Sequence, residues 1–181
     1  TPKPSSAASD VYKRQTEHRY DSLGWVKEFP NLIVSRSFSK AYGLAGLRVG
    51  FGIAQPALTD LMNRLRQPFN VNSLAQAAAI AALNDEAYLA KSAKINAEGY
   101  QQLTSAFDQM GIEYLPSFGN FVLFRAGSDD GAGGRVNLAL LKKGIIVRPV
   151  GNYGLPQWLR VSIGLPEENA AFLVALKSVL A

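Results

Sequence analysis

The most informative segment of this 181-residue chain is SRSFSKAYGLAGLRVGFG, which occupies residues 35–52. An apolar run at residues 32–34 precedes it and has the pattern of a strand buried on both faces in a parallel sheet. A lysine just beyond such a strand, as Lys40 is, lies at the carboxyl edge of the sheet, where ligands of open α/β folds bind. Desolvation at that edge favours the neutral amine that a Schiff-base lysine requires.

The residues around Lys40 also supply the parts of a phosphate site. Ser37 and Ser39 offer hydroxyl donors, Arg48 offers a guanidinium fork, and the intervening glycines allow tight turns. A lysine beside a phosphate cup indicates pyridoxal phosphate. From the residues alone, a strand, a turn and a solvated lysine remain an open alternative.

The same residues can be compared with two other sequence motifs. Residues 37–40 match the S-x-x-K of serine β-lactamases, but neither S-D-N nor K-T-G follows. The glycines of residues 43–52 do not have G-x-G-x-x-G spacing, and no P-loop is present. Both motifs are therefore rejected.

Residues 37–51, SFSKAYGLAGLRVGF, closely resemble the cofactor-lysine signature of class I/II pyridoxal-phosphate-dependent aminotransferases, and of the histidinol-phosphate aminotransferases in particular. The resemblance extends from about His18 to the end of the chain, through PSFGNFVLFR and GIIVRPVGNYGLPQWLRVSIG. It implies an α/β chain of the aspartate aminotransferase-like fold type I. Residues 16–92 would be the end of the large mixed-sheet domain, and residues 93–181 the α+β small domain.

The same resemblance implies roles for the residues of the signature. Lys40 is the implied Schiff-base lysine, which also moves the proton in catalysis. Ser37, Ser39 and Arg48 are implied to hold the phosphate of the cofactor, pyridoxal 5'-phosphate.

Arg160 is the candidate for binding the substrate. In residues 158–164 it alternates onto one strand face with Trp158 and Ser162, and an arginine in such a core-like strand needs an anion. The resemblance makes Arg160 the substrate-anchoring residue, with Arg148 as its companion on the substrate phosphate. Structural ion pairs to the glutamates at 167 and 168 remain the alternative for both arginines. Asn120 matches a family position near the substrate, and a turn-forming role remains its alternative.

The implied reaction is transamination of histidinol phosphate with 2-oxoglutarate in L-histidine biosynthesis, by a homodimer. The family's D-x-x-Y aspartate, which supports the cofactor ring, lies before the part matched here, so we expect this chain to be a truncated portion that is inactive alone. Alternatives are threonine-phosphate decarboxylase, an aromatic aminotransferase, and the aminotransferase-like effector domain of a transcription regulator.

The beginning of the chain has a separate explanation. Residues 5–15, SSAASDVYKRQ, back-translate without a misfit to a transposon-end adapter used in sequencing libraries. We therefore expect residues 1–15 to be non-native and exclude them from fold reasoning.

Composition narrows the remaining function classes. The chain is 48% hydrophobic and 18% charged, which is typical of a globular protein. It has no cysteine and one histidine, so neither a disulfide framework nor a metal site is expected. The net charge of +5 comes from dispersed residues, so we expect neither nucleic acid nor a membrane as partner. The absence of cysteine, of a bilayer-spanning apolar run and of a secretory signal predicts a cytoplasmic protein.

Hydrophobic periodicity, together with proline, glycine and helix-capping residues, predicts the elements outside the signature. Pro56 opens a helix that Pro68 stops, Ser73 caps a second helix, and Gly111 closes a long third one. The last helix is expected to bury its apolar residues up to Leu180. The loop at 127–134 is expected to be a plain surface connection, because it lacks the spacing of a calcium loop. The predicted helices are 73–83, 86–110, 135–143 and 166–180, and the predicted strands are 113–115, 121–125, 145–150 and 158–163.

Overall fold

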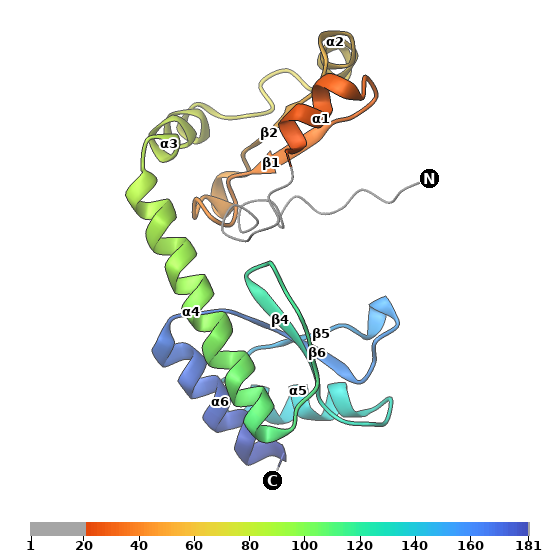
Figure 1. Cartoon of the computed structure of the whole chain (residues 1–181), viewed down its shortest axis with the longest axis vertical. Coiled ribbons are helices and arrows are strands. Elements are labelled where there is room, and N and C mark those ends of the chain that lie inside the picture. The colour runs from red at the N-terminus through yellow and green to blue at the C-terminus, as the bar shows by residue number, and fades with distance from the viewer. Residues whose placement is uncertain (1–20, 181) are drawn as a thin grey trace. The chain divides into compact units, whose positions relative to one another are not determined.

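The computed structural model describes residues 21–180, so the predicted adapter-derived segment at 1–15 lies outside the described residues. The chain forms two compact units, Thr1–Ser92 and Ala93–Ala181, with the long helix α4 passing through the boundary (Figure 1). Each unit is described by itself below.

The first unit contains a small two-stranded sheet and several helices. Strands β1 and β2 are antiparallel, with Val34 opposite Ile53 and Ser37 opposite Gly50. Helix α1 lies next to β1, and its Asp21 N-cap accepts a hydrogen bond from the Gly24 amide at 2.8 Å. The elements are α1 (Ser22–Glu28), β1 (Val34–Ser37), the 3-10 turn η3 (Ala45–Leu47), β2 (Gly50–Ile53), α2 (Pro56–Leu65), α3 (Ser73–Leu83) and the start of α4 (Glu86–Met110).

The prediction of a strand buried on both faces in a parallel sheet is wrong for the described residues. β1 begins at Val34 rather than at residue 32, and its partner β2 runs antiparallel to it. Ile33 is 46% exposed, whereas Val34 is buried. The apolar run therefore marks the approach to the strand, and only one of its residues belongs to the local core.

Helices α2 and α3 of the first unit begin at a proline and at a capping residue, respectively. Pro56 occupies the first turn of α2, where its missing N–H leaves no hydrogen bond unmade. The predicted cap of α3 is one residue off. Asn72, not Ser73, accepts the hydrogen bond from the Ala75 amide, at 2.9 Å, because Asn72 has the extended backbone of an N-cap.

The second unit is an α+β fold, as predicted. Its four strands are all antiparallel and lie in the order β3-β4-β6-β5. After α4 come β3 (Tyr114–Leu115), β4 (Phe121–Arg125), α5 (Ala132–Lys142), β5 (Arg148–Pro149), the 3-10 turn η4 (Gly151–Tyr153), β6 (Trp158–Ser162) and α6 (Pro166–Leu180).

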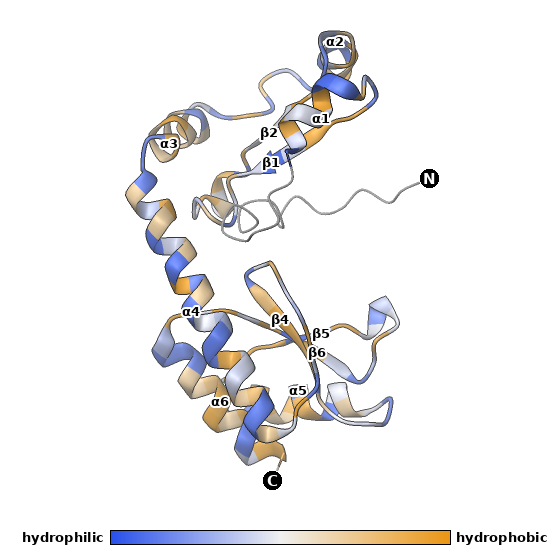
Figure 2. Ribbon diagram, in the orientation of Figure 1, coloured by the Kyte–Doolittle hydropathy of each residue, from blue (hydrophilic) through white to orange (hydrophobic). Residues whose placement is uncertain are grey.

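The core of this unit lies on one face of the sheet. Val122 and Phe124 of β4 pair with Val161 and Leu159 of β6 on that face, and all four are buried. Helices α4, α5 and α6 contribute the facing side chains of the same cluster, Leu103, Phe107, Val136, Leu140, Phe172 and Leu176. Figure 2 shows β4 coloured as hydrophobic along most of its length. The side chains that alternate to the opposite face of the sheet do not belong to this core.

Several predicted bounds in this unit change. α5 begins at Ala132, inside the predicted loop 127–134, because a turn at Asp129–Gly131 starts the helix three residues before Arg135. The predicted strand 145–150 shrinks to β5, whose second residue, Pro149, has no N–H to donate. Leu180 is 41% exposed, so its predicted burial is wrong.

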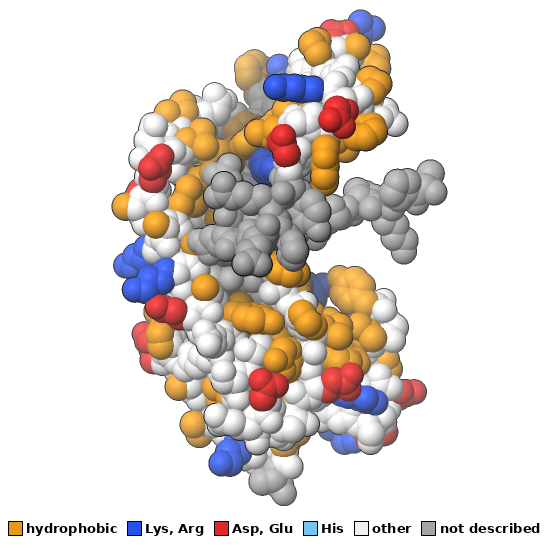
Figure 3. All heavy atoms as spheres, in the orientation of Figure 1, with side chains coloured by type: hydrophobic (Ala, Val, Ile, Leu, Met, Phe, Trp, Pro, Cys, Tyr) orange, Lys and Arg blue, Asp and Glu red, His pale blue; other side chains and the backbone are white. Residues whose placement is uncertain are grey.

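No helix within the described residues is long and apolar enough to span a membrane. Large hydrophobic side chains nevertheless reach the surface, as Figure 3 shows. Those of the first unit include Leu65, Phe69, Leu74 and Ile80.

Candidate functional site

The predicted cofactor residues lie on the connection between β1 and β2, which we call the lysine hairpin (residues 37–50). The ladder of the two strands continues into it, since the Phe38 amide donates to the Val49 carbonyl at 3.2 Å. Phe38 is 3% exposed and Ala41 is 2% exposed. These two side chains anchor the hairpin, and Lys40 between them is exposed.

The buried Phe38 belongs to the small core of the first unit. Its ring contacts Tyr42 at 4.7 Å between centroids and Phe51 at 5.7 Å. Val49 and two alanines of α3, Ala75 and Ala79, complete this cluster. Hydrophobic packing therefore holds both ends of the segment that carries Lys40.

A tight turn follows Lys40. The Gly43 amide donates to the Lys40 carbonyl at 2.9 Å, and the Leu44 amide donates to the Phe38 carbonyl at 3.0 Å. Gly43 has φ +69°, and a Cβ there would meet the Tyr88 hydroxyl at 2.6 Å. The positive φ favours glycine, because other L residues rarely adopt this backbone, and a Cβ would in addition require the Tyr88 side chain to shift.

Arg48 has an unusual backbone for a non-glycine residue, with φ 52° and ψ 48° in the left-handed region. Its guanidinium donates to the Ala45 carbonyl at 2.9 Å. Such conformations are concentrated at functional sites, where surrounding structure enforces them. At the start of the hairpin, the Ser37 hydroxyl accepts a hydrogen bond from the Ser39 amide at 3.1 Å.

The predicted cofactor residues Ser37, Ser39, Lys40 and Arg48 thus all belong to the lysine hairpin. Neither Lys40 nor Arg48 forms an ion pair with a carboxylate in the part of the chain that the structure describes. An amine, two hydroxyls and a guanidinium without a counter-ion fit a ligand that carries an aldehyde and a phosphate. The predicted desolvation of Lys40 is wrong for this structure, because the described residues leave its side chain exposed.

The second set of predicted residues lies on the sheet of the second unit. Arg148 of β5 is the direct antiparallel partner of Arg160 of β6. The same row continues through Leu123 of β4 to Leu115 of β3. The row lies on the sheet face opposite the core, since the neighbours of Arg160 along its strand are the core residues Leu159 and Val161. We call this row, with Phe121, the arginine face.

Each arginine of this face contacts an aromatic side chain. The guanidinium carbon of Arg160 lies 4.9 Å from the centroid of the Phe121 ring. The Arg148 guanidinium donates to the Tyr153 hydroxyl at 3.5 Å, which is long for a hydrogen bond. Sequence reasoning missed Phe121 and Tyr153. The strand register, which a sequence does not state, places Phe121 near Arg160, and the turn η4 returns Tyr153 to Arg148.

The alternative ion pairs for the two arginines do not form within the described residues. Glu168 instead accepts a hydrogen bond from the Leu165 amide at 2.7 Å, at the start of α6. Two like charges directly opposite each other destabilise a sheet, and an anion would compensate both. The arginine face therefore has the chemistry of an anion site.

Asn120 lies immediately before β4. Its carbonyl accepts a hydrogen bond from the Ile163 amide at 2.9 Å, which extends the ladder between β4 and β6. The preceding bend is held by α4, because the Asn96 side chain donates to the Gly119 carbonyl at 3.2 Å. The backbone of Asn120 is thus fixed beside Phe121, while its side chain makes no hydrogen bond in the described part of the chain.

The loop that contains Asp129 shows how a structural ion pair differs from the arginine face. Arg135 donates to both oxygens of Asp129, at 2.8 and 2.6 Å. The hydrogen bond from Arg135, helped by the Gly131 amide, lowers the pKa of Asp129 to about 2. The described residues contain no group of three or more His, Cys, Asp or Glu side chains that could hold a metal ion.

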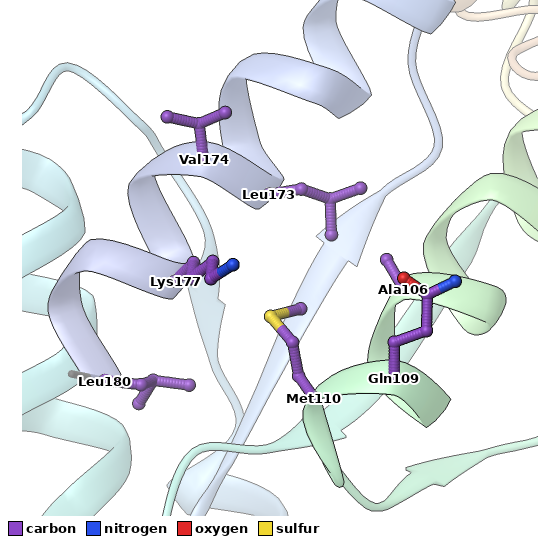
Figure 4. A pocket seen from close by; sticks show the side chains of 7 residues that line it. All are labelled: Ala106, Gln109, Met110, Leu173, Val174, Lys177 and Leu180. Carbon is purple, nitrogen blue, oxygen red and sulfur yellow. The ribbon is translucent and has the colours of Figure 1, made fainter.

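A separate groove lies between the ends of α4 and α6 (Figure 4). Met110 and Leu173 line its floor, and Lys177 contributes its only charged side chain among the lining residues. None of the predicted site residues belongs to it. The groove is therefore distinct from the arginine face.

Comparison with known proteins gives a consistent assignment. The chain matches the family "Aminotransferase class I and II" over residues 6–176. It is 72% identical over 165 residues to histidinol-phosphate aminotransferase 2 of Ralstonia nicotianae, and 65% identical over 164 residues to histidinol-phosphate aminotransferase 1 of Cupriavidus pinatubonensis. Each match covers 91% of this chain and 44% of the relative.

A solved structure shares the fold. Histidinol-phosphate aminotransferase from Sinorhizobium meliloti, in complex with pyridoxal-5'-phosphate, is 32% identical with a TM-score of 0.79. The match covers 86% of this chain and 43% of that one. The chain thus spans less than half the length of these relatives and has the fold of type I pyridoxal-phosphate-dependent transferases. Taken with the lysine hairpin and the arginine face, the match over most of the sequence shows that the chain belongs to the class I and II aminotransferase family.

Proposed function

We propose that the protein to which this chain contributes transfers the amino group of histidinol phosphate to 2-oxoglutarate, with pyridoxal 5'-phosphate as cofactor, in L-histidine biosynthesis. The observation that carries the proposal is the direct pairing of Arg148 with Arg160 and their lack of a carboxylate partner within the described residues. Two adjacent guanidiniums suit a phosphate dianion better than a single carboxylate. High identity to relatives named for this reaction supports the choice of substrate.

The lysine hairpin is the proposed cofactor site. When bound, pyridoxal phosphate supplies an aldehyde for reaction with amines and an electron sink for the carbon beside the amine. Lys40 supplies the amine that retains the cofactor. Arg48 and the hydroxyls of Ser37 and Ser39 bind its phosphate, and the left-handed backbone of Arg48 is the conformation in which that guanidinium is presented.

Lys40 has a second role in this proposal. With the cofactor bound, the Lys40 amine would be the base that accepts a proton from the substrate carbon and the acid that returns it. An exposed side chain anchored by Phe38 and Ala41 can move between these positions without disturbing the local core.

The arginine face is the proposed substrate site. Arg160 and Arg148 bind the phosphate of the amino donor, and Arg160 binds a carboxylate of 2-oxoglutarate in the second half-reaction. Asn120 contributes a side-chain amide beside Phe121. Using one arginine for both substrates explains how a single site accepts two different anions.

We also propose that turnover needs more than this chain, because it covers 44% of the length of its curated relatives. The active form is proposed to be a cytoplasmic homodimer of the full-length protein. The 181-residue chain alone is expected to show no transamination.

Borohydride reduction tests the cofactor assignment. The full-length protein, loaded with pyridoxal phosphate and reduced, should carry a pyridoxyl group on the peptide containing Lys40, as detected by mass spectrometry. Lys40→Arg should abolish the label, whereas Lys91→Arg, at an exposed lysine of α4, should keep it. A label on another lysine in the unmodified protein would contradict the assignment.

Product analysis tests the reaction. Histidinol phosphate and 2-oxoglutarate should be consumed together, with glutamate formed and no release of carbon dioxide. Carbon dioxide release from a phosphorylated amino acid would instead assign the protein as a decarboxylase, and turnover by the 181-residue chain alone would refute the need for the remaining sequence.

A further inference from the structure

We infer that Phe121 is a positioning residue that holds the guanidinium of Arg160 ready for an anion. This inference rests on the proposed function, because it concerns the residue that anchors the substrate. The contact that carries it is the stacking of Arg160 over the Phe121 ring, with 4.9 Å between guanidinium carbon and ring centroid.

The position of Phe121 in the sheet is not that of a core residue. Val122 and Phe124, its neighbours in β4, are fully buried in the hydrophobic cluster, whereas Phe121 alternates to the opposite face and is half-buried. Phe121 pairs with Ser162 and Arg160 pairs with Leu123, so the two side chains are diagonal neighbours on adjacent strands. Long side chains meet across this diagonal.

Arg160 needs such a support because its other neighbour repels it. The direct cross-strand partner of Arg160 is Arg148, which carries the same charge. Within the described residues no carboxylate pairs with Arg160, so electrostatics alone would drive the two guanidiniums apart. The face of an aromatic ring attracts a cation and fixes the plane of the guanidinium without neutralising it. Arg160 therefore keeps its full charge for a ligand.

This arrangement predicts a specific effect on anion affinity. Phe121→Leu keeps an apolar side chain on the strand but removes the ring, so Arg160 must be ordered by the anion itself. Phe121→Tyr keeps the ring face. We expect Phe121→Leu to weaken the binding of inorganic phosphate by about two- to fivefold, and Phe121→Tyr to leave it unchanged.

The experiment uses the full 181-residue chain, labelled with nitrogen-15, without cofactor. The side-chain Nε–Hε resonance of Arg160, assigned with Arg160→Lys, is followed as inorganic phosphate is added. The matched control is Phe118→Leu, at an exposed ring three residues earlier that makes no arginine contact in the described part of the chain. Amide spectra of each variant confirm that the second unit is folded.

A weaker affinity in Phe121→Leu, restored in Phe121→Tyr and absent in Phe118→Leu, supports the inference. Wild-type affinity in Phe121→Leu, an equal loss in Phe118→Leu, or an Arg160 resonance of the wild type that does not respond to phosphate would overturn it. Failure of the proposed function is distinguishable, because it shows as absence of transamination in the full-length protein rather than as a change in phosphate binding by this chain.

Discussion

Arg148 and Arg160 lie directly opposite each other on adjacent antiparallel strands, on the sheet face opposite the hydrophobic core. The arrangement is unfavourable without a ligand, since like charges in this position destabilise a strand pair. It becomes favourable when an anion binds both guanidiniums. The pairing of Arg148 with Arg160 therefore lowers the stability of the ligand-free sheet but favours the binding of an anion.

The first prediction separates these two effects. Arg148→Gln should raise the free energy of unfolding of the second unit by about 0.2–0.5 kcal/mol at low ionic strength, because it removes the like-charge pair. Native-state hydrogen exchange of the β6 amides measures this quantity. Added phosphate should stabilise the wild type more than the variant, since only the wild type retains both binding groups.

Arg125→Gln is the matched control for this prediction. Arg125 lies on the same sheet but is paired with Glu113 at 2.9 Å. Its loss should lower stability slightly, within about 1 kcal/mol, as for exposed ion pairs in general. A decrease in stability for both variants would show that the opposition of Arg148 and Arg160 costs nothing.

The second prediction concerns the left-handed backbone of Arg48. Arg48→Gly should be more stable than Arg48→Ala by about 0.5–1 kcal/mol, because only glycine adopts φ 52° without strain. Both variants should bind pyridoxal phosphate more weakly than the wild type in the full-length protein. Urea unfolding and cofactor titration check the two parts, and equal stability of the two variants would show that the conformation carries no strain.

The third prediction compares two glycines of the lysine hairpin. Gly43→Ala should destabilise the first unit by about 1–2 kcal/mol, because Gly43 has φ +69° and its Cβ would meet the Tyr88 hydroxyl. Gly46→Ala should change stability by less than about 0.5 kcal/mol, since nothing lies within 4 Å of its Cβ. Urea unfolding measured on both variants tests the contrast, and adding Tyr88→Phe should recover only the steric part of the loss.

The fourth prediction is a pH dependence of the loop before α5. The pKa of Asp129 is lowered from 3.8 to about 2, first by the hydrogen bond from Arg135 and then by the Gly131 amide. A lowered pKa means that this contribution to stability is present above the unfolded value and is lost as pH falls from about 4 through about 2. Carbon-13 titration of the Asp129 carboxyl should show the low pKa in the wild type and a value nearer 3.8 in Arg135→Gln. Arg64→Gln, in the other unit, should leave the titration unchanged, and a similar shift in that variant would rule out a local cause.

The helices were the most predictable part of the fold. Pro56, Gly111 and Pro166 mark three helix boundaries in the sequence, and the structure places α2, α4 and α6 accordingly. Proline at the first turn and glycine after the last one act locally, so their effect is visible without knowledge of the tertiary structure. The start of α5 was missed because its first turn contains two glycines, which are poor helix formers, and because the turn at Asp129–Gly131 that starts the helix was assigned to a loop.

The sequence names candidate residues for the site but not their geometry. The signature and the strand alternation indicated Lys40, Arg48 and Arg160 as separate residues. Their environments depend on the register of strands and on what covers them, which a local pattern does not encode. The exposure of Lys40 was predicted wrongly, and the contact of Arg160 with Phe121 was not predicted at all. The roles of these residues stay predictions until the experiments above are done.

Phe38 and Ala41 are buried on either side of the exposed Lys40. They anchor the backbone that carries the reactive amine, but they supply no reactive group themselves. We expect the position of this amine to depend on how these two buried hydrocarbon side chains pack. A change in the packing of Phe38 or Ala41 should therefore move the Lys40 amine without removing any reactive group. The contact between Phe38 and α3 is thus the place at which a substitution would change which atom the Lys40 amine reaches.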